Sequence, residues 1–155
     1  MIYFGKSHSS SSVHEKVIKE LEGSGPDCRK LQDLRATAEK SRDAVYAGDF
    51  VALGEAMIEN TEAQGRLHPD LVSRDARRVI EIAKEHGALG WKVNGAGGEG
   101  GSLTILTGTL SHVKRAMIRE IEAENRLFKN IPIYLSRYGL RTWDRAADIR
   151  GQSAG

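Results

Sequence analysis

The sequence contains only one cysteine and no long apolar run, and both absences limit what the protein can be. Cys28 alone cannot form an intrachain disulfide, and no CxxC pair or Cys/His cluster has the spacing of metal ligands. The opening segment MIYFGKSHSSSS lacks the apolar core of a signal peptide, and no later segment supplies the ~20 apolar residues of a membrane span. We therefore expect a cytoplasmic protein with no metal site and no membrane contact.

An excess of one charge sign is also missing. The chain has 23 Lys and Arg against 21 Asp and Glu, a formal net charge of +2, and the two signs are mixed along the sequence. This balance argues against nucleic acid or an anionic membrane as a partner. With 155 residues, 39% of them hydrophobic and 28% charged, the chain has the composition of a folded protein and the length of one domain.

Motifs of common enzyme classes are incomplete. His14 and Glu15 begin an HExxH pattern, but Ile18 stands where the second zinc ligand is required. Cys28 has no evident activating neighbour, and Arg137 beside Tyr138 fits a surface ion pair better than an anion site. Solvated or capping positions are the favoured interpretation of the remaining scattered histidines, His8, His68, His86 and His112.

Apolar periodicity is what the sequence does have. IYFG predicts a first strand, and the serines at positions 9–12 offer caps for the helix that follows; a cap is favoured here over a phosphate cradle. A spacing of three or four residues then predicts helices around the sets Val13, Val17, Ile18 and Leu21; Leu31, Leu34, Ala38, Ser41 and Val45; Phe50, Leu53, Met57, Thr61 and Gln64; and Ala76, Val79, Ile80 and Ala83. Gly48 and Gly87 are predicted helix ends, Asp49 an N-cap, and Arg77 with Glu81 an i,i+4 pair.

The third of these helices changes character along its inward face. The face is apolar as far as Met57 and then presents Asn60, Thr61 and Gln64. Buried polar groups need partners. Hydrogen bonds to neighbouring loops and a surface facing a ligand are both open interpretations.

The last third of the chain predicts a sheet. LGWKVN and SLTILT have the composition of strands, and residues 111–125 predict a helix with Val113, Met117 and Ile121 inward. IPIYLS alternates apolar residues at Ile131, Ile133 and Leu135, which predicts another strand, and GLRTW is a further candidate. The expected class is α+β, a small, mainly antiparallel sheet with helices packed on one face.

A glycine-rich loop lies between the first two of these strands, in WKVNGAGGEGGSLTIL. Gly95 to Gly100 fit GxGxxG, and Glu120 has the distance of a ribose-binding carboxylate, but that motif must open a helix and here a strand follows. The outer spacing of a P-loop is also met, yet Gly101 replaces the required lysine. A protein-kinase glycine lid is excluded because HRD and DFG segments are missing.

Glycine density remains informative, because such a loop brings backbone N–H groups to an anion and allows another backbone to approach closely. A flexible hairpin turn is the alternative. Five glycines among residues 95–101 are more than a turn requires, so a functional role is favoured.

The segment GALGWKVNGAGGEGGSLTIL resembles the third conserved motif of the GHMP kinases, K-x-x-G-A-G-x-G-G followed by a strand. Lys92 begins the match, Gly98 and Glu99 form its variable centre, and the other matching positions are Gly95, Ala96, Gly97, Gly100 and Gly101. IYFGKSHSSSSVHEKVI resembles the opening of the C-terminal domain in sugar-kinase members, including heptose-phosphate kinases. The resemblance covers about residues 1–143, and Glu99 departs from the small residue usual at its position.

The resemblance implies that residues 1–144 are a GHMP kinase C-terminal domain, of ferredoxin-like type with extra helices, followed by a flexible tail, 145–155. Such kinases transfer phosphoryl from ATP, with Mg²⁺, to a hydroxyl of a small molecule, here a sugar or sugar phosphate. The implied nucleotide and substrate loop is Gly95, Ala96, Gly97, Gly98, Glu99, Gly100 and Gly101, and the implied substrate-binding residues are Lys92, Asn94, Asn60 and Gln64.

The same resemblance implies a missing partner. The family's nucleotide loop, P-x-x-x-G-L-G-S-S-A, belongs to an N-terminal domain or subunit and does not occur in this sequence. We therefore expect the 155 residues to be inactive alone. A non-catalytic module that binds a small molecule or protein in the same cleft is the alternative, and the residues do not decide between a monomer and a homodimer.

Overall fold

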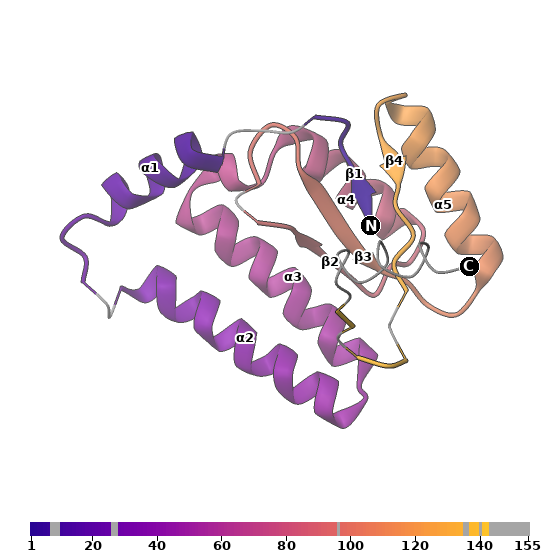
Figure 1. Cartoon of the computed structure of the whole chain (residues 1–155), viewed down its shortest axis with the longest axis horizontal. Helices are drawn as coiled ribbons and strands as arrows, with labels where there is room; N and C mark the ends of the chain where they lie inside the picture. Colours follow the sequence, from indigo (N-terminus) through magenta and orange to yellow (C-terminus); the bar gives the residue numbers. More distant parts are fainter. Residues whose placement is uncertain (7–9, 26–27, 96, 135–136, 140, 143–155) are drawn as a thin grey trace, which may run out of the picture.

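The computed structural model describes residues 1–6, 10–25, 28–95, 97–134, 137–139 and 141–142 (Figure 1). Its helices are α1 (Ser10–Leu21), α2 (Arg29–Ala47), α3 (Phe50–Leu67), the 3-10 turn η1 (Pro69–Leu71), α4 (Arg74–Glu85) and α5 (Ser111–Glu124). Its strands are β1 (Ile2–Tyr3), β2 (Gly90–Val93), β3 (Ser102–Leu106) and β4 (Lys129–Asn130). The predicted α+β class is confirmed.

The four strands form one antiparallel sheet in the order β2-β3-β1-β4. β1 therefore lies in the middle of the sheet, between β3 and β4, although it begins the chain (Figure 1). Pairing continues one residue past β4, because the Ile131 N–H donates to the Met1 carbonyl oxygen at 2.8 Å. The Met1 amino group donates to the Ile131 carbonyl oxygen at 3.1 Å, and burial lowers the pKa of this amino group.

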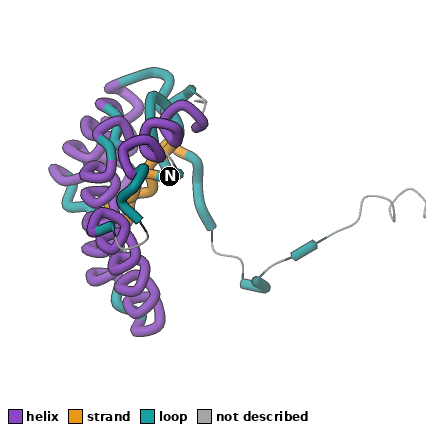
Figure 2. Tube along the Cα trace, turned by 90° about the vertical axis from the view of Figure 1, so that its left-hand side faces the viewer, coloured by secondary structure: helices purple, strands orange, loops and turns teal. Residues whose placement is uncertain are grey.

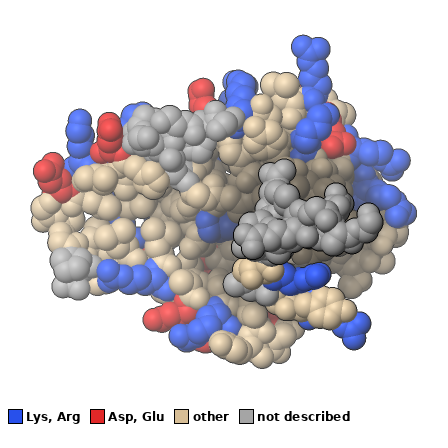
Figure 3. All heavy atoms as spheres, viewed as in Figure 1, with Lys and Arg blue, Asp and Glu red and all other residues tan. Residues whose placement is uncertain are grey.

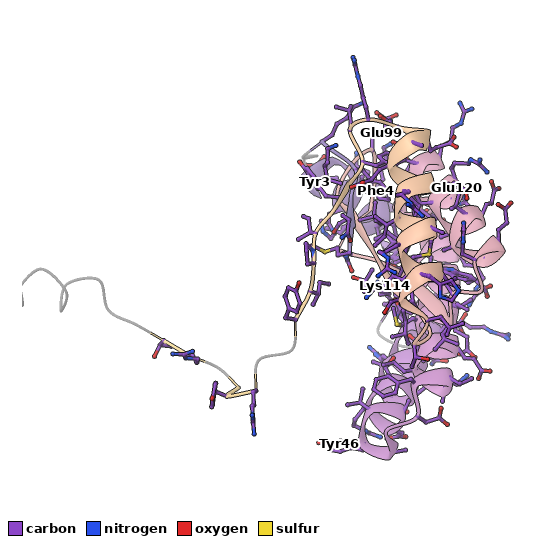
Figure 4. The ribbon with its side chains drawn as sticks, turned by 90° about the vertical axis from the view of Figure 1, so that its right-hand side faces the viewer. Tyr3, Phe4, Tyr46, Glu99, Lys114 and Glu120 are labelled. Atoms are coloured by element: carbon purple, nitrogen blue, oxygen red, sulfur yellow. The ribbon has the colours of Figure 1, made fainter. Side chains whose placement is uncertain are left out.

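The main core lies between the sheet and two helices. Ile2 pairs with Leu103, and Leu103 with Val93, so the three buried side chains share one face of the sheet. Helices α4 and α5 cover this face (Figure 4) and contribute buried residues that include Val79, Ile82, Met117 and Ile121. The Phe4 and Phe128 rings meet edge to face, with centroids 5.3 Å apart. The predicted inward stripes of α4 and α5 are therefore confirmed.

Helix α3 covers the free edge of the sheet along β2. A Cβ on Gly54 would collide with the Leu89 carbonyl group, and one on Gly90 would collide with the Gly54 backbone, so both positions require glycine. The Thr61 hydroxyl lies 3.1 Å from the Trp91 carbonyl oxygen and accepts the Val93 N–H at 3.3 Å. An edge strand exposes such groups unless something covers them, and here α3 satisfies them with one side chain.

Helices α1 and α2 lie outside α3 (Figure 1) and close a second, smaller cluster around Val13, Leu67 and Leu71. The predicted helix ends are confirmed, since Gly48 adopts a left-handed φ of 66° and the Asp49 carboxylate caps the next helix. The predicted inward stripe of α2 is wrong in part. Ala38 and Val45 are exposed, and the buried residues of α2 are Thr37 and Ala44. The side chains of these two residues are small, so α2 lies close along α3.

The strand predicted from IPIYLS, residues 131–136, is wrong for its described residues, 131–134. The last described strand is Lys129–Asn130, Ile133 is 58% exposed, and Leu135 and Ser136 lie outside the described residues. Figure 2 shows this segment leaving the body of the protein. Beyond Ile131 no described strand lies beside it, and Pro132 has no N–H to donate.

The described residues of the further candidate strand, Gly139, Arg141 and Thr142, are not extended into a strand, and its other two residues lie outside the described part. The expected tail, 145–155, also lies outside the described residues. In the part of the chain that the structure describes, no helix is long and apolar enough to cross a membrane.

The predicted ion pair of α4 is also corrected. Glu81 pairs with Arg78 at 3.3 Å and not with Arg77, and Arg78 reaches Glu124 of α5 at 3.0 Å. A partner on the neighbouring helix thus decides which arginine pairs. These carboxylates raise the pKa of Arg78. Gly87 has a left-handed φ of 68° just after α4, as predicted for its end.

Candidate functional site

The glycine loop joins β2 to β3 as an antiparallel hairpin, which confirms the prediction that two strands flank it. No helix opens after Gly100, so the dinucleotide interpretation is excluded by the structure as it was by the sequence. All five glycines of the loop have positive φ, from 63° at Gly97 to 121° at Gly100. Residues with a Cβ rarely adopt such a backbone.

The loop is fixed against two distant segments. A Cβ on Gly97 would collide with the carbonyl group of Leu71 in η1, and one on Gly100 would lie 2.5 Å from the Lys6 carbonyl oxygen. Gly98 donates its N–H to the Asp70 carbonyl oxygen, and Gly101 donates to that of Lys6, both at 3.0 Å. The close backbone approach expected of these glycines therefore occurs within the chain itself, and two of the loop's amides already have partners.

Lys92 and Gln64 support the start of the loop. The Lys92 ammonium donates to the Gln64 side-chain oxygen at 2.8 Å and to the Val93 carbonyl oxygen. The Gln64 amide nitrogen donates in turn to the Gly95 carbonyl oxygen at 3.0 Å. Burial lowers the pKa of Lys92. These two residues connect α3, β2 and the loop.

The other two sequence-predicted residues, Asn94 and Asn60, do not take part in the Lys92–Gln64 contact. Asn94 donates from its amide nitrogen to the Ser102 hydroxyl at 2.9 Å and accepts from the Thr104 hydroxyl at 3.1 Å, across the hairpin. Asn60 donates to the Thr37 hydroxyl at 2.6 Å, between α2 and α3. The polar face of α3 thus hydrogen-bonds neighbouring elements, which is one of the two interpretations that the sequence left open.

A cleft of about 810 Å³ borders the loop at Gly98, Glu99 and Gly100. It lies between the residues following β1, helix α1, η1 and the first turn of α4, and Gly98, Glu99 and Gly100 form one of its walls. Four basic residues line it: Lys6, Lys16, Arg74 and Arg77. The sequence interpretation missed all four, since they come from three separate segments. One signal for this site was available in the sequence. Ser73 is a typical N-cap residue; its side chain caps α4, and it lines the cleft, so the N-terminus of α4 lies there.

The charges of the cleft are partly compensated. Lys16 pairs with Asp70 at 2.7 Å, and this contact lowers the pKa of the Asp70 carboxyl. Lys6, Arg74 and Arg77 form no ion pair with a described residue, and neither do the two remaining acidic groups of the lining, Asp75 and Glu99. The lining is therefore mixed in sign, as is the face in Figure 3, where basic and acidic side chains occur on both halves. Figure 4 shows Glu99 and Tyr46 at opposite ends of the molecule.

Comparison with known proteins places this hairpin and cleft in a family. Residues 41–122, just over half of the chain, match the family described as GHMP kinases C terminal. The chain belongs to the GHMP kinase C-terminal domain family. The match spans α3, η1, α4, the glycine hairpin and most of α5, which are the elements that form the loop and one side of the cleft.

The fold of the chain is similar to that of a solved GHMP kinase. The chain resembles L. major mevalonate kinase, solved in complex with R-mevalonate, with a TM-score of 0.67 and 22% sequence identity. The match covers 79% of this chain and 37% of the kinase, so the chain spans just over a third of the length of that relative. No curated protein sequence matches the chain.

Kinases of this family generally use ATP and Mg²⁺. Among the described residues no group of three or more His, Cys, Asp or Glu could hold a metal ion.

Proposed function

We propose that the chain is the C-terminal half of an ATP-dependent kinase that phosphorylates a hydroxyl of a sugar or sugar phosphate. The observation that carries this proposal is the glycine hairpin, fixed by η1 and the Lys6 segment so that residues Gly98 to Gly100 border a cleft of about 810 Å³. A volume of this order suits a small-molecule ligand. Membership of the GHMP family supports phosphoryl transfer as the chemistry.

In this proposal the loop, Gly95 to Gly101, borders the nucleotide and the acceptor as a rigid wall. Lys92 and Gln64 hold its first residue, Gly95, in place and in this proposal also bind the substrate. Asn94 keeps the two arms of the hairpin in register through Ser102 and Thr104. Asn60 acts at the α2–α3 contact, further from the loop.

The chain alone is proposed to be inactive. Phosphoryl transfer depends on holding the γ-phosphate in line with a hydroxyl and on neutralising its charge, and one wall of a site does neither. An N-terminal domain or subunit would supply the nucleotide-cradling loop and a carboxylate for Mg²⁺. The exposed apolar side chains beyond β4 support such a partner, since Ile133 and Tyr134 are 58% and 86% exposed.

The test is ADP release by the purified chain, measured with hexoses, heptose phosphates and R-mevalonate as acceptors. We expect no acceptor-dependent turnover from the chain alone, and turnover once a cognate GHMP N-terminal domain is fused ahead of Met1 or added in trans. The N-terminal domain by itself is the control. Robust turnover by the 155 residues alone would contradict the half-enzyme proposal.

A non-catalytic binding module is the second candidate, and the same experiment separates it. The cleft beside the loop presents basic and acidic side chains of this chain, and this observation favours a binding role. Saturable binding of a ligand without turnover in the presence of any GHMP N-terminal domain would favour the module. Mass measurement in solution decides between a monomer and a homodimer.

A further inference from the structure

The wall that the glycine hairpin presents to the cleft rests on one short turn, η1. Two consecutive carbonyl groups of η1 meet the loop: that of Leu71 packs against Gly97, and that of Asp70 accepts the Gly98 N–H at 3.0 Å. Gly97 and Gly98 are both buried, and Gly98 also lines the cleft. Because these contacts are close, a shift of η1 would displace the wall of the cleft with it.

A 3-10 turn of three residues has little stability of its own, because its hydrogen bonds are few and their geometry is poor. In η1 the first residue is Pro69, which has no N–H to donate. The next N–H is that of Asp70, and the ring nitrogen Nδ1 of His68 accepts it at 3.1 Å. This bond requires a neutral imidazole with its proton on Nε2. The His68 side chain is only 16% exposed, so few water molecules can replace the bond.

His68 also connects this turn to helix α3. It follows the last residue of α3, and its own N–H donates to the Gln64 carbonyl oxygen at 3.1 Å. The side-chain amide of Gln64 donates to the Gly95 carbonyl oxygen at 3.0 Å. The end of α3 therefore holds the loop at two points, directly at Gly95 and through η1 at Gly98.

We propose that His68 is a positioning residue for the glycine wall of the cleft. It is not among the described residues that line the cleft, and it acts through η1: its ring fixes the Asp70 N–H, and the Asp70 carbonyl group fixes Gly98. The sequence favoured a solvated or capping role for this histidine, and the cap gives that role a consequence for the site. The effect on turnover rests on the proposed function, whereas the effect on the loop is a property of this chain alone.

The first experiment measures hydrogen exchange of single amides by NMR in the 155-residue chain. His68→Leu keeps a side chain of similar size but has no acceptor, whereas asparagine in His68→Asn is a preferred capping residue. We expect the Gly98 amide to exchange about tenfold faster in His68→Leu, because the loss of a side-chain cap weakens the contacts that depend on it by up to roughly that factor. In His68→Asn the rate should stay within about twofold of the unsubstituted chain.

Two other amides show whether the change is local. The acceptors of the Gly101 and Val93 amides lie outside η1, so their exchange should change less than about twofold in His68→Leu. His14→Leu, the same substitution at an exposed position of α1, is the matched control and should leave all three amides unchanged. Circular dichroism shows that each variant is folded, and His68→Ala replaces the leucine variant if that one is not. An unchanged rate at Gly98, or equal acceleration of all three amides, would overturn the inference.

The second experiment uses the chain fused to a cognate GHMP N-terminal domain. We expect His68→Leu to lower kcat about tenfold and to change KM less than about twofold, because a displaced wall misaligns the bound groups without removing a contact to them. His68→Asn should restore kcat to within about threefold. Absence of turnover in every variant, with the exchange result intact, would refute the proposed function alone. Equal turnover in the two variants and the unsubstituted enzyme would refute this inference alone.

Discussion

Two segments of this protein have similar apolar alternation, and only one of them is a strand. In β3, Leu103 is fully buried and lies between β2 and β1, with hydrogen-bonded partners on both sides. The segment after β4 has Ile131 and Ile133 in the same alternation, but its side chains are exposed and its backbone pairs only as far as Met1. The sequence pattern predicted a strand in both places.

The difference shows that alternation fits a strand but does not create one. A strand is stabilised by cross-strand side-chain pairs and by backbone partners, which lie elsewhere in the chain. The β2–β3 hairpin has both, because α3 covers its edge and the glycine loop is fixed to η1 and Lys6. The segment over 132–134 has neither within the described residues.

The largest effect is expected from Gly97→Val, which breaks the anchored side of the comparison. Valine would need a left-handed backbone and would collide with the Leu71 carbonyl group, so we expect a loss of roughly 4 kcal/mol in the free energy of unfolding. Glu99→Gly, two residues away and exposed, should cost less than about 0.5 kcal/mol. Urea unfolding measures both variants.

In the assembled two-domain kinase, Gly97→Val should also weaken nucleotide affinity more than Glu99→Gly does. Equal tolerance of the two changes would reduce the loop to a simple connector.

The second prediction compares the two apolar segments directly. Leu103→Ala should lower the free energy of unfolding by about 3 kcal/mol, because it leaves a cavity in a fully buried site. Ile133→Ala should change it by less than about 0.5 kcal/mol, since the side chain is 58% exposed. Chemical denaturation of the isolated chain gives both values. A cost above about 1 kcal/mol for Ile133→Ala would show that this segment packs on the body after all.

The third prediction concerns the covered edge of β2. Thr61→Val keeps the shape of the side chain but leaves the buried Val93 N–H without its acceptor, which should cost roughly 2 kcal/mol. Hydrogen exchange of the Val93 amide should become faster. Thr109→Val, at an exposed position, is the matched control and should be neutral. An unchanged exchange rate at Val93 would mean that the Thr61 hydroxyl does not protect this edge.

Much of the fold could be predicted because its signals are local. The capping carboxylate of Asp49, the helix end at Gly48 and the stripe through Val79 and Ile80 each act within one helix, and each was found in the structure. Interactions between distant segments could not be predicted in this way. Gly54 is an example: its place inside a helix was an available signal, but only the packing of α3 on Gly90 explains it.

The candidate site divides in the same way. The glycine loop and its two strands could be predicted from the sequence, and the GHMP resemblance came from the same residues. The cleft beside the loop could not, because Lys6, Arg74 and Arg77 are far apart in the chain and ordinary in sequence. Lys92 and Gln64 were singled out, but their mutual hydrogen bond and its support of Gly95 appear only in the folded chain.

The sequence by itself therefore determined the family, the α+β class, the helix ends and the hairpin with its glycine loop. The family followed from a motif resemblance, whereas the class, the helix ends and the hairpin depend on local backbone preference and on apolar period, which neighbouring residues set. The tertiary structure alone decided which apolar segment becomes a strand, which glycines are required for close packing, and which charges meet at the cleft. Those outcomes depend on contacts between distant residues, because pairing, burial and electrostatic interaction are properties of atoms that are close in space.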